Sequence, residues 1–150
     1  MKIYSNNFKK AIDLIDDDFI YQGGQAKVYG KDKLAYKIYL DPKNCIPDLK
    51  FQELSVLDND QVIKPESLIF DQHKNKVGFS MKLIDTKNSM PICRLFTRTF
   101  KEQENLTQDK IIDIIRKFQN LIQNIHSKNI LVVDLNELNF LIDNVLEKIY

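Results

Sequence analysis

The sequence predicts an α+β fold in which a five-stranded antiparallel sheet with one helix is joined to a helical part. Two observations carry this prediction. Strand-like segments separated by turn signals fill residues 19–40 and 61–84, and a long amphipathic pattern covers residues 107–128. A shorter helical pattern at 47–58 separates the two groups of strands. The predicted order is therefore three strands, a helix, two strands, further helices and a short hairpin.

The first predicted element is a short amphipathic helix over residues 6–16. Phe8, Ile12 and Ile15 recur there at the i, i+4 and i+7 spacing of one helix face. Three consecutive aspartates, residues 16–18, end it.

Residues 19–40 read as consecutive hairpins. Strands are expected at Phe19–Gln22, Ala26–Gly30 and Lys33–Leu40, with Gly23-Gly24 and Lys31-Asp32 as the turns. Alternation in the third strand places Ala35, Lys37 and Tyr39 on one face. Because both faces of that strand are largely apolar, we expect both to be covered and Lys37 to lie among apolar neighbours.

The helix predicted at 47–58 carries an acid on its apolar side. Pro47 suits a first helical turn, and an apolar face is formed by Ile46, Leu49, Val56 and Leu57. Glu53 falls in the middle of that face, and a carboxylate there needs a cationic or hydrogen-bonding partner.

Two more strands are expected at 61–71 and 76–84, with Pro65 marking a bulge or an edge in the first. Residues 91–102 are ambiguous and favour a short helix.

The clearest element is the helix at 107–128. Thr107 can serve as its N-cap, Asp109 suits its first turn, and Asn129 is a suitable left-handed stop. Its wide apolar stripe consists of Ile111, Ile112, Ile114, Ile115, Phe118, Leu121, Ile122 and Ile125. Residues 130–150 return to strand-like composition, interrupted by one acid, Asp134.

Composition and charge limit the classes of function that we expect. The 150 residues include only 4 glycines and 4 prolines, and three of the glycines fall within residues 23–30. A net charge of +1 offers no general attraction to nucleic acid or to an anionic membrane, and no apolar segment is long enough to span one. Cys45 and Cys93 show neither metal-ligand spacing nor a disulfide framework, so we expect a cytoplasmic protein.

Three groups of residues suggest chemistry, and each has a plainer explanation. Gly23-Gly24 would let a backbone approach a phosphate, or would supply the positive φ of a hairpin turn. Lys37 and Glu53 would each cost free energy if buried alone, and an ion pair between them would remove that cost. Alternatively, the lysine extends its ammonium to water and the glutamate is half-exposed. Asp134 and Asn139 suit metal-phosphate chemistry or the local caps of a turn.

The order of these groups resembles the eukaryotic-like protein kinase family. Five segments carry the resemblance: QGGQAKVY, LAYKIY, FQELSVL, GFSMKLID and IHSKNILVVDLNELNFLI. They are similar, in order, to the glycine-rich loop, the strand of the V-A-I-K motif, the αC helix, the strand that enters the hinge, and the catalytic loop. The resemblance covers residues 19–150.

The resemblance implies an ATP site between an N-lobe with its hinge (1–84) and an incomplete C-lobe (85–150). Val28 and Ala35 would contact adenine beneath a loop containing Gly23 and Gly24. Lys37, held by Glu53, would contact the α and β phosphates.

It also implies roles at the hinge and in the catalytic loop. Met81 would be the gatekeeper, Lys82 would lie in the hinge, and the backbone of Ile84 would bind adenine. Asn139 would help to hold Mg²⁺, and Asp134 would accept the proton of the substrate hydroxyl.

Departures from the family pattern limit this expectation. Tyr21 and Ala26 stand where two loop glycines are expected, and Val132-Val133 replaces the histidine and arginine of the catalytic loop. Asn136 replaces its usual lysine, and the sequence ends at Tyr150 before any D-F-G segment.

The expected function is therefore that of an ATP-binding chain. Its parent activity would be phosphoryl transfer to a protein Ser/Thr hydroxyl, weak or absent in these 150 residues. The alternatives are an inactive pseudokinase-type module that binds a nucleotide or a partner protein, and part of a small-molecule kinase.

Overall fold

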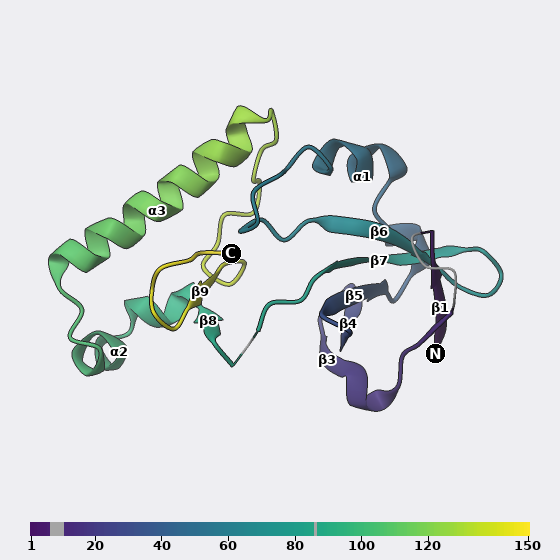
Figure 1. Cartoon of the computed structure of the whole chain (residues 1–150), viewed down its shortest axis with the longest axis horizontal. Helices are drawn as coiled ribbons and strands as arrows, with labels where there is room; N and C mark the ends of the chain where they lie inside the picture. The colour runs from purple at the N-terminus through teal and green to yellow at the C-terminus, as the bar shows by residue number, and fades with distance from the viewer. Residues whose placement is uncertain (7–10, 86) are drawn as a thin grey trace. The chain divides into compact units, whose positions relative to one another are not determined.

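The structure, a computed structural model, describes residues 1–6, 11–85 and 87–150 (Figure 1). Contacts divide it into two compact units. Unit 1 consists of Met1–Val56 and Ile63–Leu83, and unit 2 of Leu57–Val62 and Ile84–Tyr150. The short segment 57–62 therefore belongs with the C-terminal half of the chain.

Unit 1 is built on a seven-stranded antiparallel sheet of order β2-β1-β6-β7-β5-β4-β3. Its strands are β1 (Lys2–Ser5), β2 (Ile12–Asp13), β3 (Phe19–Gln22), β4 (Ala26–Lys31), β5 (Leu34–Tyr39), β6 (Pro65–Phe70) and β7 (Lys76–Lys82). The prediction of a five-stranded, kinase-like sheet followed by the first C-lobe helices is therefore wrong. Strands β3 to β7 lie at the five segments expected from the sequence, but β1 and β2 extend the sheet beyond β6.

Strand β2 lies where a helix was predicted, over residues 6–16. Residues 7–10 lie outside the described part of the chain, and the rest of the predicted helix contains β2 and a 3-10 helix at Asp16–Asp18. The physical reason is a period of two: Leu14 is buried and Ile15 is exposed, which suits an extended segment beside β1. Ile3, Leu14 and Ile69 belong to the same core cluster, so the added N-terminal segment contributes side chains to the core of unit 1.

The helix of unit 1, α1 (Asp48–Leu54), contains no buried residue, which contradicts the apolar face predicted for it. Leu49 is 68% exposed and Val56 is 49% exposed. The start of the helix is held by Lys76, whose Nζ donates to Asp48 at 2.6 Å and to the carbonyl of Ile46 at 2.8 Å.

Unit 2 combines helices with a two-stranded sheet of β8 (Ser89–Pro91) and β9 (Leu141–Asp143). A 3-10 helix (Ile92–Phe96) and α2 (Arg98–Gln103) lead to the long helix α3 (Gln108–Ser127), seen in Figure 1. The hairpin expected within residues 130–150 is present at its end: Ile142 forms an antiparallel bridge with Ile149, and Leu141 and Tyr150 exchange backbone hydrogen bonds at 2.9 and 2.8 Å. β9 also pairs with β8, about fifty residues earlier in the chain, which local patterns did not predict.

Helix α3 forms as its sequence predicts. The Oγ1 of Thr107 accepts a hydrogen bond from the N–H of Lys110 at 3.2 Å, and Asn129 has the left-handed φ of 59° that ends the helix. Ile114, Leu121 and Ile125 are buried, but Ile115 is 51% exposed. Part of the predicted stripe therefore faces solvent.

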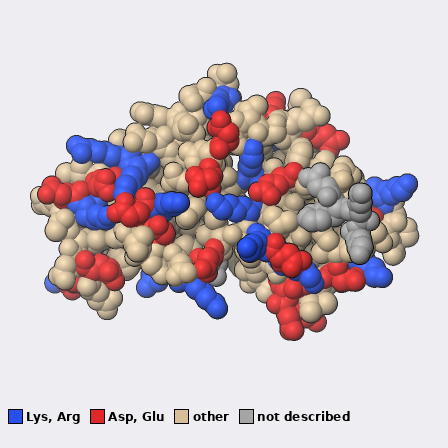
Figure 2. Space-filling model, in the orientation of Figure 1, with Lys and Arg blue, Asp and Glu red and all other residues tan. Residues whose placement is uncertain are grey.

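The surface carries both signs of charge. Basic and acidic side chains are interspersed on the face drawn in Figure 2. None of the helices in the described part of the chain is long and apolar enough to cross a membrane.

Candidate functional site

Four residues predicted to contact ATP share one face of the unit 1 sheet. Cross-strand pairing places Val28 opposite Lys37, and Ala35 opposite Met81. Because directly paired residues point to the same side, and Ala35 and Lys37 are two apart, these residues form two neighbouring rows. Ala35 is buried and the other three are half-buried. The core cluster that contains Tyr36 lies on the opposite face.

Lys37 has aromatic neighbours on this face. Its Nζ lies 5.4 Å from the ring centre of Tyr39 and 5.8 Å from that of Phe79. Both distances fall within cation–π range, worth about 0.5–1 kcal/mol where water is present. Burial raises the pKa of Tyr39 further above its ordinary value near 10, and the phenol is neutral at neutral pH in either case. No ion pair within the described part of the chain includes Lys37.

The predicted pair of Lys37 and Glu53 is not formed. Glu53 lies on the exposed side of α1, with about half of its side chain in water, and its nearest cation is Lys50 at 3.9 Å. An exposed carboxylate needs no buried partner, so the argument from burial does not hold for this glutamate. The structure instead leaves the Lys37 ammonium with two aromatic faces and no carboxylate from the described residues.

Gly23 and Gly24 lie in the turn between β3 and β4. The N–H of Gly23 donates to the carbonyl of Ala26 at 2.9 Å, which closes the turn. Neither glycine has a positive φ, so the hairpin does not require glycine for its backbone conformation. The left-handed residues of this region are Asp32 and Lys33, at the next turn.

The space around each glycine shows whether close packing requires a residue without a side chain at that position. A Cβ on Gly30 would lie 2.7 Å from Ile20, and a Cβ on Gly78 only 2.0 Å from the carbonyl oxygen of Lys37. A Cβ on Gly23 would lie 3.3 Å from the Tyr21 ring, whereas one on Gly24 would meet nothing within 4 Å. Gly24 is thus the one glycine for which the fold supplies no steric reason.

Of the two predicted hinge residues, Lys82 does not lie on this face. Lys82 pairs with Leu34, which packs against the core cluster, and so lies on the opposite side of the sheet. Ile84 belongs to unit 2. The hinge roles that the kinase resemblance implies for Lys82 and Ile84 therefore stay predictions.

In unit 2, Asp134 and Asn139 are brought together. The Nδ2 of Asn139 donates to the carboxylate of Asp134 at 2.8 Å and to its backbone carbonyl at 3.0 Å. Asn136 donates from its own Nδ2 to the other carboxylate oxygen at 2.6 Å, and its Oδ1 accepts from the N–H of Leu138. The loop is thus a compact, exposed turn in which amides hold a carboxylate in place.

This loop does not form a complete Mg²⁺ site. Each carboxylate oxygen of Asp134 accepts one amide hydrogen, and the side-chain oxygen of Asn139 is the atom that would face a cation. No group of three or more His, Cys, Asp or Glu side chains that could hold a metal occurs within the described ranges. Mg²⁺ usually takes one or two carboxylates together with phosphate oxygens and water. The role of Asn139 as a metal ligand stays a prediction.

Sequence reasoning missed two features of these sites. It placed Tyr39 on the face of Lys37 but could not find Phe79, because the register between β5 and β7 is not encoded locally. It treated Asn136 only as the loss of a lysine, although an Asn two residues after an Asp is a recognised turn signal that could have indicated the bond to Asp134.

The sequence matches no protein-family model, and comparison with curated proteins finds no significant relative. The kinase resemblance therefore rests on the quoted motifs.

Proposed function

We propose that this chain binds ATP on the face of the unit 1 sheet that carries Val28, Ala35, Lys37 and Met81. The observation that carries the proposal is that these four residues, taken from three strands, meet in two adjacent rows. Val28 and Met81, which are half-buried, present apolar surface for a base, whereas Ala35 is only 3% exposed. The fourth presents an ammonium that no carboxylate among the described residues neutralises.

The chemistry of these groups suits a nucleotide. A half-buried ammonium near apolar groups gains more from a phosphate than an exposed one does, since water screens it less. Gly24, at the end of the same hairpin, leaves backbone free of side chain where a phosphate could approach. A combination of apolar surface, one cation and open backbone is typical of a phosphate-bearing aromatic ligand.

We further propose that phosphoryl transfer to a protein Ser/Thr hydroxyl, the parent activity, is weak or absent. Such catalysis depends on positioning and on metal-assisted charge stabilisation. Glu53 does not hold Lys37 in this structure, and the described residues contain no cluster of three or more His, Cys, Asp or Glu side chains that could hold a metal. These observations favour a nucleotide-binding module over an efficient transferase. Two free cysteines, Cys45 and Cys93, agree with the cytoplasm as its place of action.

Binding is tested by titrating the full chain with ATP, with and without Mg²⁺, by calorimetry and by thermal shift. Saturation at about 100 times Kd should stabilise the fold by roughly 2.7 kcal/mol. Lys37→Met should weaken binding about tenfold or more, because a charge-assisted bond to phosphate is lost. Lys27→Met is the matched control, since Lys27 precedes Val28 and faces the other side of β4.

Gly24→Ala gives an independent test of the loop. A Cβ there meets nothing within 4 Å and requires no left-handed φ, so the fold should keep its stability. ATP affinity should nevertheless fall if the phosphates approach this backbone. Unchanged affinity in both Gly24→Ala and Lys37→Met would refute the proposed site.

Transfer is tested separately with Mg-ATP and a generic protein acceptor. We expect little phosphate incorporation above background. Robust turnover that Lys37→Ala abolishes would contradict the inactive assignment while supporting the ATP site, whereas turnover that survives Lys37→Ala would contradict both.

A further inference from the structure

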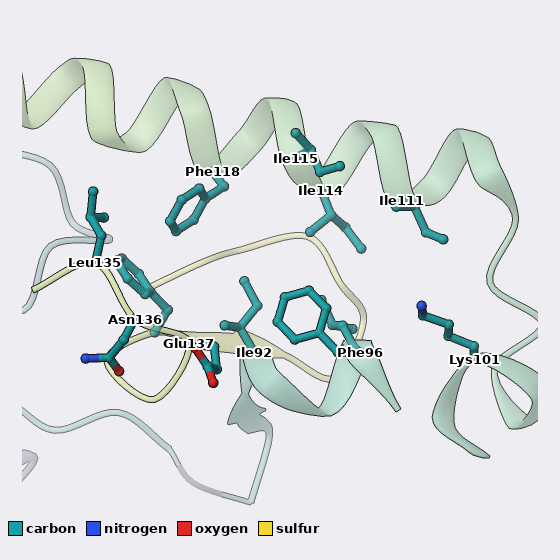
Figure 3. A pocket seen from close by; sticks show the side chains of 12 residues that line it. Ile92, Phe96, Lys101, Ile111, Ile114, Ile115, Phe118, Leu135, Asn136 and Glu137 are labelled. Atoms are coloured by element: carbon teal, nitrogen blue, oxygen red, sulfur yellow. The ribbon is translucent and has the colours of Figure 1, made fainter. Parts of the chain in front are cut away.

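Unit 2 contains an apolar cavity whose lining includes none of the residues assigned to nucleotide. It has a volume of about 350 Å³, within the roughly 300–1,000 Å³ of small-molecule sites. Its walls come from the 3-10 helix at Ile92–Phe96, one face of α3, and the segment 135–140 (Figure 3). The cavity belongs to unit 2 alone, so it does not depend on the proposed nucleotide site.

The floor of the cavity is preformed. Ile92, Leu95, Ile114 and Phe140 are each less than 9% exposed. The rings of Phe118 and Phe140 meet edge to face at 4.8 Å between centres, which fixes one wall. A floor of ordered, buried side chains needs little rearrangement to accept an apolar ligand.

The rim of the cavity carries more large apolar side chains than is usual for a surface that contacts only water. Phe96 is 68% exposed, Ile115 is 51% exposed and Leu135 is 50% exposed, and all three line the cavity. Large apolar side chains gathered around a hollow indicate a binding site more strongly than scattered ones do.

Charged side chains occur at two places along the lining. Lys101 of α2 extends toward Ile111 at one end, and Glu137 lies toward the other end in Figure 3. No ion pair within the described residues includes either side chain. An anionic head group is therefore attracted to the Lys101 end and repelled from the Glu137 end, which fixes the direction of an elongated ligand.

We propose that this cavity binds an amphiphilic carboxylate, with its apolar chain along α3 and its carboxylate at Lys101. A volume at the lower end of small-molecule sites suits an alkyl chain of medium length. The ligand class is that of a medium-chain fatty acid. The stem of Lys101 extends the apolar wall while its ammonium stays in water to meet the carboxylate.

The test uses decanoate, decanol and decylamine, each below its aggregation concentration, with the full chain. Decanoate should bind about fivefold more tightly than decanol, the size of one exposed ion pair. Lys101→Met, which keeps an apolar stem, should reduce decanoate affinity to that of decanol and leave decanol unchanged. Equal binding of decanoate and decanol, or tighter binding of decylamine, would overturn the assignment of a carboxylate.

The location is tested by isoleucine-methyl NMR and by a matched pair of variants. Decanoate should shift the methyl signals of Ile111, Ile114 and Ile115 and leave that of Ile3, in the unit 1 core, in place. Ile115→Lys should weaken binding strongly. Ile112→Lys should not, because Ile112 is a similarly exposed residue of α3 that does not line the cavity.

Sedimentation of the ligand-free variants tests whether the cavity is instead a contact between protein chains. If Ile115→Lys changes the oligomeric state and Ile112→Lys does not, the cavity is a contact between protein chains and the fatty-acid proposal fails. The proposal expects the same sedimentation for wild type and both variants.

Discussion

Close packing requires a glycine at position 78 but not at position 24, and alanine substitutions at the two positions test this difference. In β7, the backbone of Gly78 is so close to β5 that a Cβ would lie 2.0 Å from the carbonyl oxygen of Lys37. Gly78→Ala should therefore force the two strands apart and destabilise the fold by about 3 kcal/mol or more. Urea unfolding of this variant and of Gly24→Ala measures the contrast, and equal stability of the two would contradict the described register.

A second residue-scale prediction concerns acid stability. Glu147 accepts hydrogen bonds from Lys110 and Lys117, and these bonds lower its pKa from 4.5 to about 2. A carboxyl whose pKa is depressed by folding stabilises the fold above its unfolded pKa, and this stabilisation is lost as pH falls. The Tm advantage of wild type over Glu147→Gln should be full above about pH 5 and should disappear toward pH 2.

The control for this pH profile is Glu66→Gln. Glu66 is exposed on β6 and has no ion pair among the described residues, so the Tm difference from wild type should stay nearly constant over the same range. A pH-independent difference for Glu147→Gln as well would show that the contacts of Glu147 with α3 contribute nothing in solution.

At the scale of elements, the start of α3 depends on one side chain. The Oγ1 of Thr107 satisfies the N–H of Lys110, which would otherwise lack a partner in the helix. Thr107→Ala should cost about 1 kcal/mol of unfolding free energy, measured in urea, while Thr107→Ser should recover most of it. Equal losses in the two variants would mean that the hydroxyl does not cap the helix.

Helix α1 is the element that sequence reasoning described least well, and two leucines test its description. Leu49 is 68% exposed, so Leu49→Ala should change stability by less than about 0.5 kcal/mol. Leu57, just beyond the helix, is only 3% exposed, and Leu57→Ala should cost about 2–5 kcal/mol. A large loss from Leu49→Ala would restore the predicted apolar face.

The contrast between α1 and α3 shows what local sequence can predict. The cap, the stop and the long apolar pattern of α3 are all local signals, and its bounds follow from them. In α1 the pattern covers only two turns, and burial depends on what packs against it, which the pattern does not encode. The turn between β4 and β5 was predicted at Lys31-Asp32, one residue before the left-handed pair Asp32 and Lys33, so the register of even this local hairpin was predicted wrongly.

At the scale of the whole molecule, the pairing of strands that are far apart in the sequence could not be predicted from local patterns. β1 pairs with β6, more than sixty residues away, and β8 pairs with β9 across about fifty. Such partners are chosen by burial in the folded chain, so the seven-stranded sheet was missed. The candidate site was predicted better, because alternation alone placed Ala35, Lys37 and Tyr39 on one face. Phe79 required the register, and the separation of Glu53 from Lys37 required the exposure of α1.

The central claim, that nucleotide binds on the β4–β5–β7 face, is tested most directly by NMR of ¹³C-methyl methionine. The chain has 3 methionines, and Met81 lies in that face, whereas Met90 is a buried residue of unit 2. Titration with ATP should shift the Met81 signal saturably and leave Met90 in place, and Lys37→Met, whose added methionine gives a separate fourth signal, should weaken the response. A shift of Met90 alone, or no shift of Met81 at millimolar ATP, would contradict the account.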